Sequence, residues 1–303
     1  VLRHYYEAGG NSPHILLKAA SAEIDLVRAS EYLEKAFLDF SAKEPWPDFN
    51  WMERTVERAA KLGLKELSLQ LAHALKDQAD TARSAFPVFS HIYAMRALII
   101  AGADEAAIRK GISDAKSFFP QDNKEVVGIG IVSGPIVWGS SGLEAEARRA
   151  IANLQARIGN VEGAIQMMDG IDDPVFAWSD MLTSDIPLKH LKDLLDAASA
   201  ILTDEEHAYV RAQHAQELLF FGGMKKQLYW ARATANDLLQ GRQLSGDRAV
   251  LIYSSLTRVG AKLEDQDIER LALTKMAQAA LNSRDFGDLI TAGFRWHQSS
   301  LTP

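Results

Sequence analysis

ARIGNVEGAIQMMDGIDDP, residues 156–174, contains two helical patterns joined by a tight turn. Apolar residues recur at three- and four-residue spacing along this stretch, which is typical of amphipathic helices. Gly159 and Asn160 form the turn, and Gly159 supplies the left-handed backbone conformation that ends a helix. Pro174 lies between helical segments, where no backbone donor is needed. The stretch therefore predicts a short helical hairpin.

The same pattern recurs along the chain, while the period-two alternation of strands is hard to find. The glycines expected to end helices are Gly63, Gly102, Gly159, Gly222 and Gly260. Capping boxes are expected at Asp122 with Glu125, at Ser141 with Glu144 and at Thr203 with Glu206. A helical hairpin cannot bury its apolar face alone, so stacked hairpins share one core and small residues let their backbones approach. We therefore predict an all-α chain that forms a single helical-repeat domain over residues 1–303.

Two segments carry a family resemblance. In residues 156–174, Gly159 and Asn160 lie at the turn, Ala164 at the small helix-crossing position and Pro174 at the end of the unit. In AGADEAAIRKGISDAKSFFP the corresponding residues are Gly102, Ala107 and Pro120. These segments resemble tetratricopeptide-type repeats. The resemblance implies a right-handed α-solenoid whose concave groove binds a peptide or protein. An irregular helical bundle and an α/α toroid are the alternative folds.

The repeat spacing stretches around GIGIVSGPIVWGSSG, residues 128–142. A dinucleotide site would need a strand before these glycines and a helix directly after them, and the flanking residues do not fit that arrangement. We expect instead a helix that runs from Asp122 to Pro135, with glycines where another helix crosses closely. A buried connector over residues 136–138 would follow, with Ser141 capping the next helix. The stretch is thus expected to be an irregular junction between two runs of hairpins.

Composition excludes several classes of function. The 303 residues are 47% hydrophobic and 24% charged, as in ordinary globular proteins, and the net charge of −7 with scattered basic residues argues against a nucleic-acid partner. Because there is no cysteine, disulfides and thiolate chemistry are excluded. No apolar run is long enough to span a membrane. The chain starts at Val1, so we expect either a removed leader or a fragment, and the location is either cytoplasmic or extracytoplasmic.

Candidate binding residues lie in TDEEHAYVRAQHAQE, residues 203–217. His207, Arg211 and His214 fall on one helical stripe beside a stripe of alanines. If the alanines pack on the neighbouring hairpin, this stripe could line the groove; the alternative is a solvated face. Trp230 is a further groove candidate because aromatic side chains are enriched at binding hot spots, although a core position is the simpler interpretation.

Catalytic and metal motifs are missing. His73 with Asp77 and His190 with Asp193 have helical ligand spacing, but no third ligand can be named. Acidic clusters lie at expected helix starts, where the helix dipole favours them. We therefore expect no cofactor and no metal, and predict a non-catalytic scaffold or adaptor that binds a protein or peptide. A sensor that closes its groove over a peptide or small ligand and an α/α-toroid enzyme are the alternatives.

Overall fold

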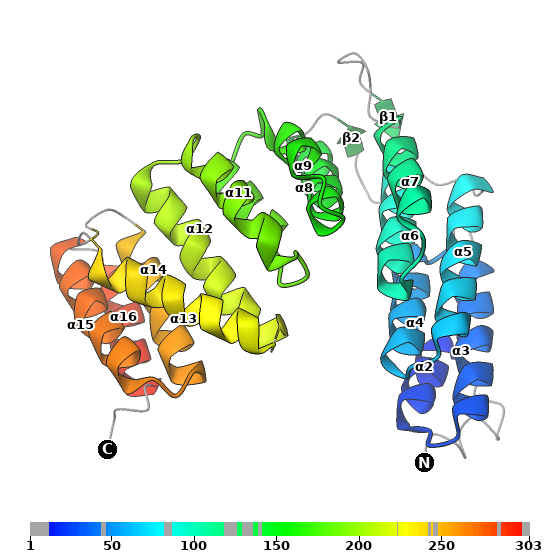
Figure 1. The fold of residues 1–303 in the computed structure, drawn as a ribbon, viewed down its shortest axis with the longest axis horizontal. Coiled ribbons are helices and arrows are strands. Elements are labelled where there is room, and N and C mark those ends of the chain that lie inside the picture. The colour runs from blue at the N-terminus through cyan, green and yellow to red at the C-terminus, as the bar shows by residue number, and fades with distance from the viewer. Residues whose placement is uncertain are drawn as a thin grey trace. The chain divides into compact units, whose positions relative to one another are not determined.

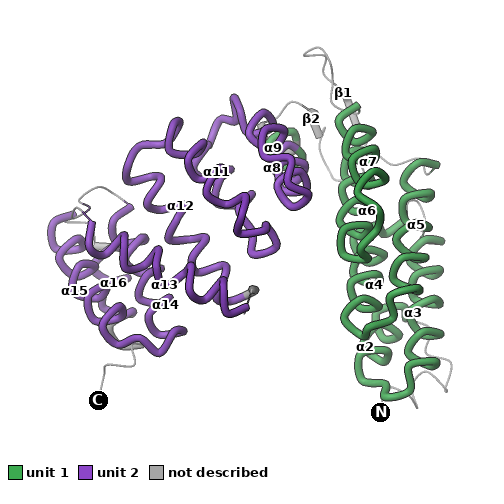
Figure 2. Tube along the Cα trace, viewed as in Figure 1, with its two compact units in different colours: residues 1–147 green, residues 148–303 purple. Residues whose placement is uncertain are grey.

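The computed structural model divides the chain into two compact units, residues 1–147 and residues 148–303 (Figure 2). It describes residues 12–43, 47–81, 87–117, 126–128, 136–138, 141–222, 224–241, 244, 248–283 and 286–298. Nearly all of these residues are helical, which confirms the all-α prediction (Figure 1). The prediction of one continuous repeat domain over residues 1–303 stays a prediction.

Unit 1 consists of helices that contact their neighbours along the chain, and several alternate helices also contact each other. Its helices are α2 (Pro13–Ala22), α3 (Leu26–Ser41), α4 (Phe49–Lys61), α5 (Lys65–Thr81), α6 (Pro87–Ala101) and α7 (Glu105–Ser117). Helix α4 packs on α2 and α6 as well as on α3 and α5, and α3 also contacts α5. The alternate helices of unit 1 therefore lie side by side, as the green part of Figure 2 shows.

Unit 2 begins within α8 (Ser141–Arg157) and repeats this arrangement. Its other helices are α9 (Val161–Met168), α10 (Pro174–Met181), α11 (Leu188–Ser199), α12 (Asp204–Glu217), the π-helix η1 (Leu218–Gly222), α13 (Lys225–Gln240), α14 (Ala249–Lys262), α15 (Gln266–Ser283) and α16 (Phe286–Gln298). Helices α10, α12, α14 and α16 contact one another in that order, and we call them the even-helix layer. On the other side of the unit, α9 contacts α11 and α13 contacts α15.

Small residues form much of the core of unit 2, as expected for closely packed hairpins. Ala212 and Ala215 of α12 and Ala231 and Ala235 of α13 are all fully buried. Tyr253 of α14 is fully buried with them, and its hydroxyl oxygen accepts a hydrogen bond of 3.1 Å from the backbone N–H of Leu244. Alanine side chains let neighbouring helix backbones approach closely. Larger buried side chains such as Tyr253 fill the space that remains between the helices.

Three of the glycine turns are confirmed. Gly63, Gly102 and Gly159 have φ of +77°, +73° and +81°, in the left-handed region that favours glycine. At the last of these turns the Asn160 side chain accepts a hydrogen bond of 3.2 Å from the backbone N–H of Gly163 and thereby caps α9. The two helical segments and the glycine turn that were predicted for residues 156–174 are therefore present as α8, the turn and α9.

The prediction that Gly260 ends a helix is wrong. Gly260 lies inside α14, which continues to Lys262, and a Cβ at this position would come within 2.6 Å of the backbone nitrogen of Glu269. Glycine is therefore used where α14 and α15 cross. The left-handed residue after α14 is instead Glu264, with φ of 53°. Periodicity alone did not separate a crossing glycine from a terminating one, because both follow apolar helical runs.

Glu264 carries a Cβ, and its left-handed backbone conformation is strained for such a residue. Its replacement by glycine should therefore stabilise unit 2. We expect Glu264→Gly to raise the free energy of unfolding by about 0.5 to 1 kcal/mol, since relief of the backbone strain exceeds the added flexibility of the unfolded chain. Urea denaturation followed by circular dichroism measures this. Ala261→Gly, within α14, is the control and should lower the same quantity by about 1 kcal/mol. A loss of stability in Glu264→Gly would contradict the prediction.

The glycine-rich stretch also differs from expectation. Val126–Gly128 form strand β1 and Ile136–Trp138 form strand β2, an antiparallel pair with Val127 opposite Val137, where we had expected a helix up to Pro135. β-Branched residues favour the extended backbone, and glycines disfavour a helix. The predicted burial of residues 136–138, the predicted structure of residues 129–135 and the cap at Asp122 lie outside what the structure describes. Helix α8 begins at Ser141, where a helix start was expected.

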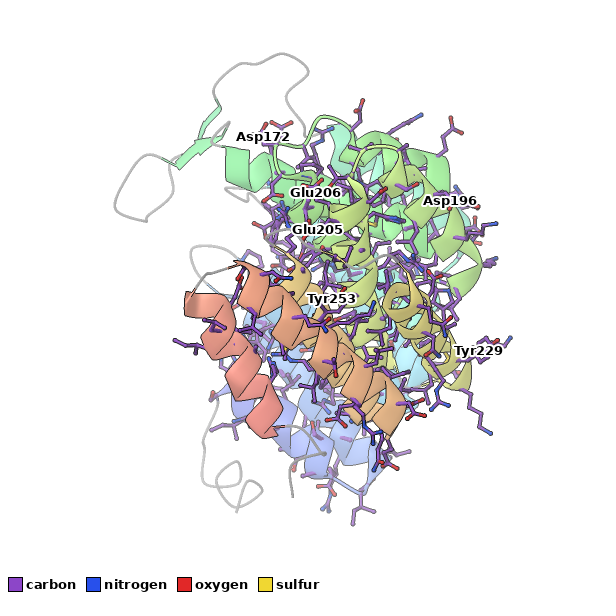
Figure 3. The ribbon with its side chains drawn as sticks, turned by 90° about the vertical axis from the view of Figure 1, so that its left-hand side faces the viewer. Asp172, Asp196, Glu205, Glu206, Tyr229 and Tyr253 are labelled. Carbon is purple, nitrogen blue, oxygen red and sulfur yellow. The ribbon has the colours of Figure 1, made fainter. Side chains whose placement is uncertain are left out.

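The expected cap at the start of α12 is confirmed. Thr203 and Glu206 form a capping box, in which the Glu206 carboxylate accepts a hydrogen bond of 3.0 Å from the backbone N–H of Thr203. Hydrogen bonds from the Thr203 backbone and side chain hold the pKa of Glu206 below its usual value, and Arg248 adds a favourable charge. The backbone N–H of Arg248 donates to Glu205 at 3.0 Å. The two glutamates are thus parts of a helix end, on the side of unit 2 seen in Figure 3.

Candidate functional site

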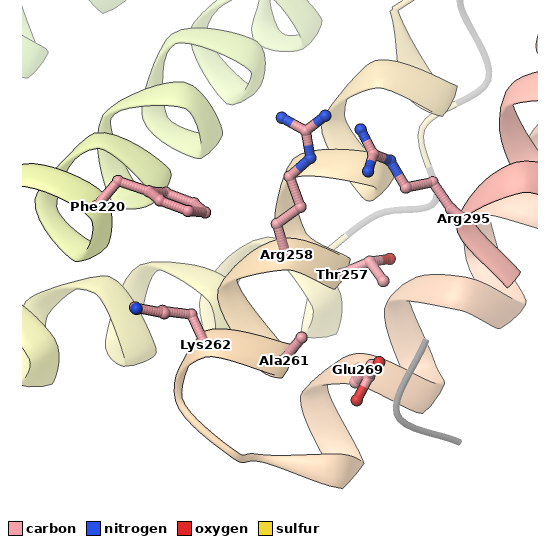
Figure 4. A pocket seen from close by; sticks show the side chains of 7 residues that line it. All are labelled: Phe220, Thr257, Arg258, Ala261, Lys262, Glu269 and Arg295. Atoms are coloured by element: carbon pink, nitrogen blue, oxygen red, sulfur yellow. The ribbon is translucent and has the colours of Figure 1, made fainter. Parts of the chain in front are cut away.

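Two pockets open on the even-helix layer of unit 2. The first, which we call the acidic pocket, has a volume of about 380 Å³ and lies between α10 and α12. Its lining residues are Phe176, Ser179, Asp180, Leu182, Thr183, Tyr209, Gln213 and Glu217. The second, the basic pocket, has a volume of about 360 Å³ and is lined by Phe220, Thr257, Arg258, Ala261, Lys262, Glu269 and Arg295 (Figure 4). Both volumes are in the range of small-ligand sites.

Helix α8 holds the α10 side of the acidic pocket in place. The Arg149 guanidinium forms an ion pair with Asp180, with 2.9 Å between Nε and Oδ2, and lies 4.8 Å from the ring centroid of Phe176. The amide Nδ2 of Asn153 donates to the backbone oxygen of Met181 and to the hydroxyl of Thr183, each at 2.8 Å. Asn153 is itself buried. These contacts fix the aromatic and polar side chains that α10 presents to the pocket.

The α12 side of the acidic pocket carries Tyr209, Gln213 and Glu217. The amide Nε2 of Gln213 donates to the hydroxyl of Ser255 on α14 at 3.0 Å, so the pocket side of α12 is tied to the next helix of the layer. Burial raises the pKa of Glu217, and a hydrogen bond from the backbone of Ser184 partly opposes that shift. A raised pKa favours the protonated form of a carboxyl group. The protonated form can donate a hydrogen bond as well as accept one.

The basic pocket combines cationic side chains with one aromatic ring. Arg258 and Lys262 project from α14, Arg295 comes from α16, and Glu269 of α15 is almost completely buried at the wall. The Arg295 Nε donates to the hydroxyl of Ser254 at 2.9 Å, which orients that guanidinium. In Figure 4 the guanidinium groups of Arg258 and Arg295 point to the same side of the pocket. The arrangement concentrates positive charge around a concave surface.

The π-helix η1 positions the aromatic ring of the basic pocket. The chain leaves α12 and continues as η1, and the Phe220 side chain on η1 is 52% exposed at the pocket edge. The Lys262 Nζ lies 5.9 Å from its ring centroid. Single π-turns in helices change the direction of side chains and are frequent at functional sites. Here the π-turn lies where α12 passes from the acidic pocket to the basic pocket.

Three of the four candidate residues from the sequence lie on α12, on the side that faces α11 and α13, and the fourth, Trp230, lies on α13. Arg211 pairs with Asp237 of α13, with 2.6 Å between NH2 and Oδ2. His214 is only 2% exposed, and its ring meets the half-buried ring of Trp230 edge-on at a centroid distance of 5.3 Å. His207 lies near the backbone of Leu195 on α11. A buried His214 does not line an open groove.

Burial determines the protonation of the two histidines on this stripe. Desolvation lowers the pKa of His214 to about 4, and the backbone of Thr183 only partly opposes the shift. Neither ring nitrogen of His214 makes a hydrogen bond that meets normal geometry among the described residues. Desolvation and the charge of Arg211 lower the pKa of His207. The neutral ring of His214 therefore acts as a packing group, and binding by the four residues stays a prediction.

The pocket residues of α12 follow a different stripe, which the sequence interpretation missed. Tyr209, Gln213 and Glu217 repeat every four residues, so they share one face of the helix, and it is not the face of His207 and Arg211. A mixed aromatic and polar stripe was a signal available in the sequence. This signal did not identify the pocket face, because the stripe of His207, Arg211 and His214 also carries polar side chains and aromatic rings.

The described ranges contain neither a metal-binding cluster nor a membrane-spanning helix. In those ranges no three His, Asp or Glu side chains come together as a metal site would require. His190 instead covers the turn at Gly159, where an added Cβ would lie 2.8 Å from its Nε2. No helix in the part of the chain described here is both long enough and apolar enough to cross a bilayer.

Fold and pockets together define an all-α protein of packed helices with two pockets on one helix layer of unit 2. Comparison with models of protein families, with curated proteins and with solved structures yields no match.

Proposed function

We propose that this protein is a non-catalytic binding protein, a tetratricopeptide-like array of helical hairpins whose even-helix layer in unit 2 binds a peptide segment of a partner protein. Contacts between alternate helices support the repeat architecture, since stacked hairpins bring every second helix together. The turns at Gly63, Gly102 and Gly159 support it as well. In such arrays one layer of helices presents the binding surface.

One observation carries the proposal: two pockets open on the same layer, and one continuous helical segment contributes to both. Tyr209, Gln213 and Glu217 line the acidic pocket, and Phe220, about one turn further along, lines the basic pocket. An extended peptide lying across these helices would place successive side chains in the two pockets. Each pocket includes an exposed phenylalanine, Phe176 in the acidic pocket and Phe220 in the basic pocket, and aromatic side chains are enriched at binding interfaces.

The test is selection of random twelve-residue peptides against the full chain, followed by measurement of Kd for the enriched peptides. We expect dissociation constants in the micromolar range and at least tenfold weaker binding by Phe176→Ala, which removes an anchor worth about 1.4 kcal/mol or more. Ile201→Ala is the matched control, because Ile201 and Phe176 are both 53% exposed in unit 2 and only Phe176 lines a pocket. The control should change Kd by less than twofold.

Two results would overturn the proposal. One is failure to enrich any peptide over the bare support. The other is equal weakening by Phe176→Ala and Ile201→Ala, which would mean that binding does not use the pocket. Circular dichroism of both variants verifies that the helices are retained.

A further inference from the structure

The acidic pocket has two carboxyl groups and no cationic side chain among its described lining residues. Asp180 of α10 and Glu217 of α12 supply the carboxyl groups. The Arg149 guanidinium of α8 pairs with Asp180 and is largely covered, with 12% of its side chain exposed, so these two charges cancel. Glu217 forms no ion pair with any residue in the described ranges. The charge that remains in the pocket is therefore that of Glu217.

The surroundings of Glu217 contain no compensating positive charge. Desolvation raises the pKa of its carboxyl group, a hydrogen bond from the backbone of Ser184 opposes this shift, and the charge of Asp185 raises the pKa further. Asp185 has its own partner, with 3.5 Å between its Oδ2 and NH2 of Arg157. No cation among the described residues lowers the pKa of Glu217. A cation that entered the pocket would stabilise the ionised carboxylate.

The aromatic and hydroxyl groups of the pocket suit a cation as well. Phe176 and Tyr209 place one ring on α10 and one on α12, and Phe176 is still 53% exposed beside Arg149. The face of an aromatic ring attracts cations, and the Arg149 guanidinium against the Phe176 ring is an example within this structure. The Ser179 hydroxyl oxygen is buried in the pocket lining and has no hydrogen-bond partner among the described residues. It can accept a hydrogen bond from an N–H group of a ligand.

Size and polarity narrow the choice of ligand. The volume of about 380 Å³ lies at the low end of the range of ligand sites, which suits one side chain. An anionic side chain would be repelled by Glu217. An apolar side chain would leave the buried Ser179 oxygen without a hydrogen bond, which costs free energy. A cationic side chain can contact the carboxylate, the rings and the hydroxyl together.

We propose that the acidic pocket binds a cationic side chain of the partner peptide, Arg or Lys, between the Glu217 carboxylate and the rings of Phe176 and Tyr209. This rests on the proposed function, because it names the chemical group that the peptide places in one of the two pockets. The N–H groups of the cation donate to Glu217 and Ser179, and its charge lies against the aromatic rings.

The test uses the full chain and pools of hexapeptides that are acetylated, amidated and labelled with an uncharged dye, with binding followed by fluorescence anisotropy. Each pool has one fixed residue among random uncharged residues, and the fixed residue is Arg, Lys, citrulline, norleucine or Glu. Citrulline keeps nearly the shape of Arg without its charge, and norleucine does the same for Lys. We expect the Arg or the Lys pool to bind at least tenfold more tightly than its neutral counterpart and than the Glu pool. The first two pools separate the two sources of the cation.

Variants locate the binding. Glu217→Gln keeps the shape of the side chain and removes its charge, so it should reduce the preference for the cationic pool over its neutral counterpart to less than threefold. Glu162→Gln is the matched control, because the same substitution is made at an exposed residue of α9 outside the pocket. This control should keep the full preference. The ratio of two Kd values is used because a general loss of structure would weaken both pools alike, and circular dichroism shows whether each variant folds.

The outcomes separate this inference from the proposed function. If all pools bind with similar affinity and Phe176→Ala still weakens binding, the peptide-binding function stands and the cation inference falls. Tightest binding by the Glu pool, or an equal loss of preference in Glu217→Gln and Glu162→Gln, also overturns the cation inference. If no pool binds and the selection enriches no peptide, both proposals fall.

Discussion

Gly260→Ala is expected to lower the free energy of unfolding of unit 2 by about 2 to 3 kcal/mol. The new methyl group would lie 2.6 Å from the backbone nitrogen of Glu269 and 2.9 Å from its Cα, so α14 and α15 would have to separate. This cost exceeds the gain of about 1 kcal/mol that alanine normally brings to a helix interior. The obstacle is backbone, which cannot rotate away as the end of a flexible side chain can.

Gly293→Ala is the matched control, because Gly293 is also inside a helix of unit 2 and an added Cβ there meets nothing within 4 Å. It should raise stability by about 0.5 to 1 kcal/mol. Hydrogen exchange of peptides covering α14 and α15, together with urea denaturation, measures the change in this unit separately from unit 1. Equal effects of the two alanines would show that the crossing at Gly260 is not close.

Loss of stability on acidification is the second large effect, and His214 is its source. Burial lowers the pKa of His214 to about 4 in the folded chain, whereas an unfolded histidine titrates near 6.5. Between these values the unfolded chain binds more protons, so stability rises with pH and falls as the pH decreases from about 6.5 to 4. The difference corresponds to about 3 kcal/mol, fully lost below pH 4.

His214→Leu removes the titrating ring while it keeps an apolar group of similar size in this buried position. We expect the variant to match the wild type within about 1 kcal/mol at pH 7.5 and to be more stable by about 2 kcal/mol at pH 4.5. Protection of α12 and α13 in hydrogen exchange at both pH values reports this locally. His207→Gln is the comparison, and because His207 is only half-buried its effect should be smaller. Identical pH dependence in wild type and His214→Leu would refute the assignment.

Much of the local structure was predictable, because it depends on residues close in sequence. The left-handed turns at Gly63, Gly102 and Gly159 and the capping box of Thr203 with Glu206 are present as expected. Each needs only one glycine or one pair of polar side chains three residues apart. The helices followed from apolar spacing in the same way.

The site was less predictable, because the direction of a helix face depends on partners far along the chain. The sequence identified α12 as important but selected the stripe of His207, Arg211 and His214. In the fold that stripe meets α11 and α13, and Tyr209, Gln213 and Glu217 face the pocket instead. Both stripes carry polar and aromatic residues, so composition could not rank them.

The sequence by itself determined an all-α chain, a few helix ends and the exclusion of thiol chemistry. Only the tertiary structure decided that Gly260 is a crossing residue, that Val126–Gly128 pair with Ile136–Trp138, and that Arg258 and Arg295 share one pocket. The physical reason is the separation in sequence of the residues that interact. Helix propensity and capping act over three to five residues, whereas crossings, strand pairing and pockets depend on which distant segments the apolar core brings together.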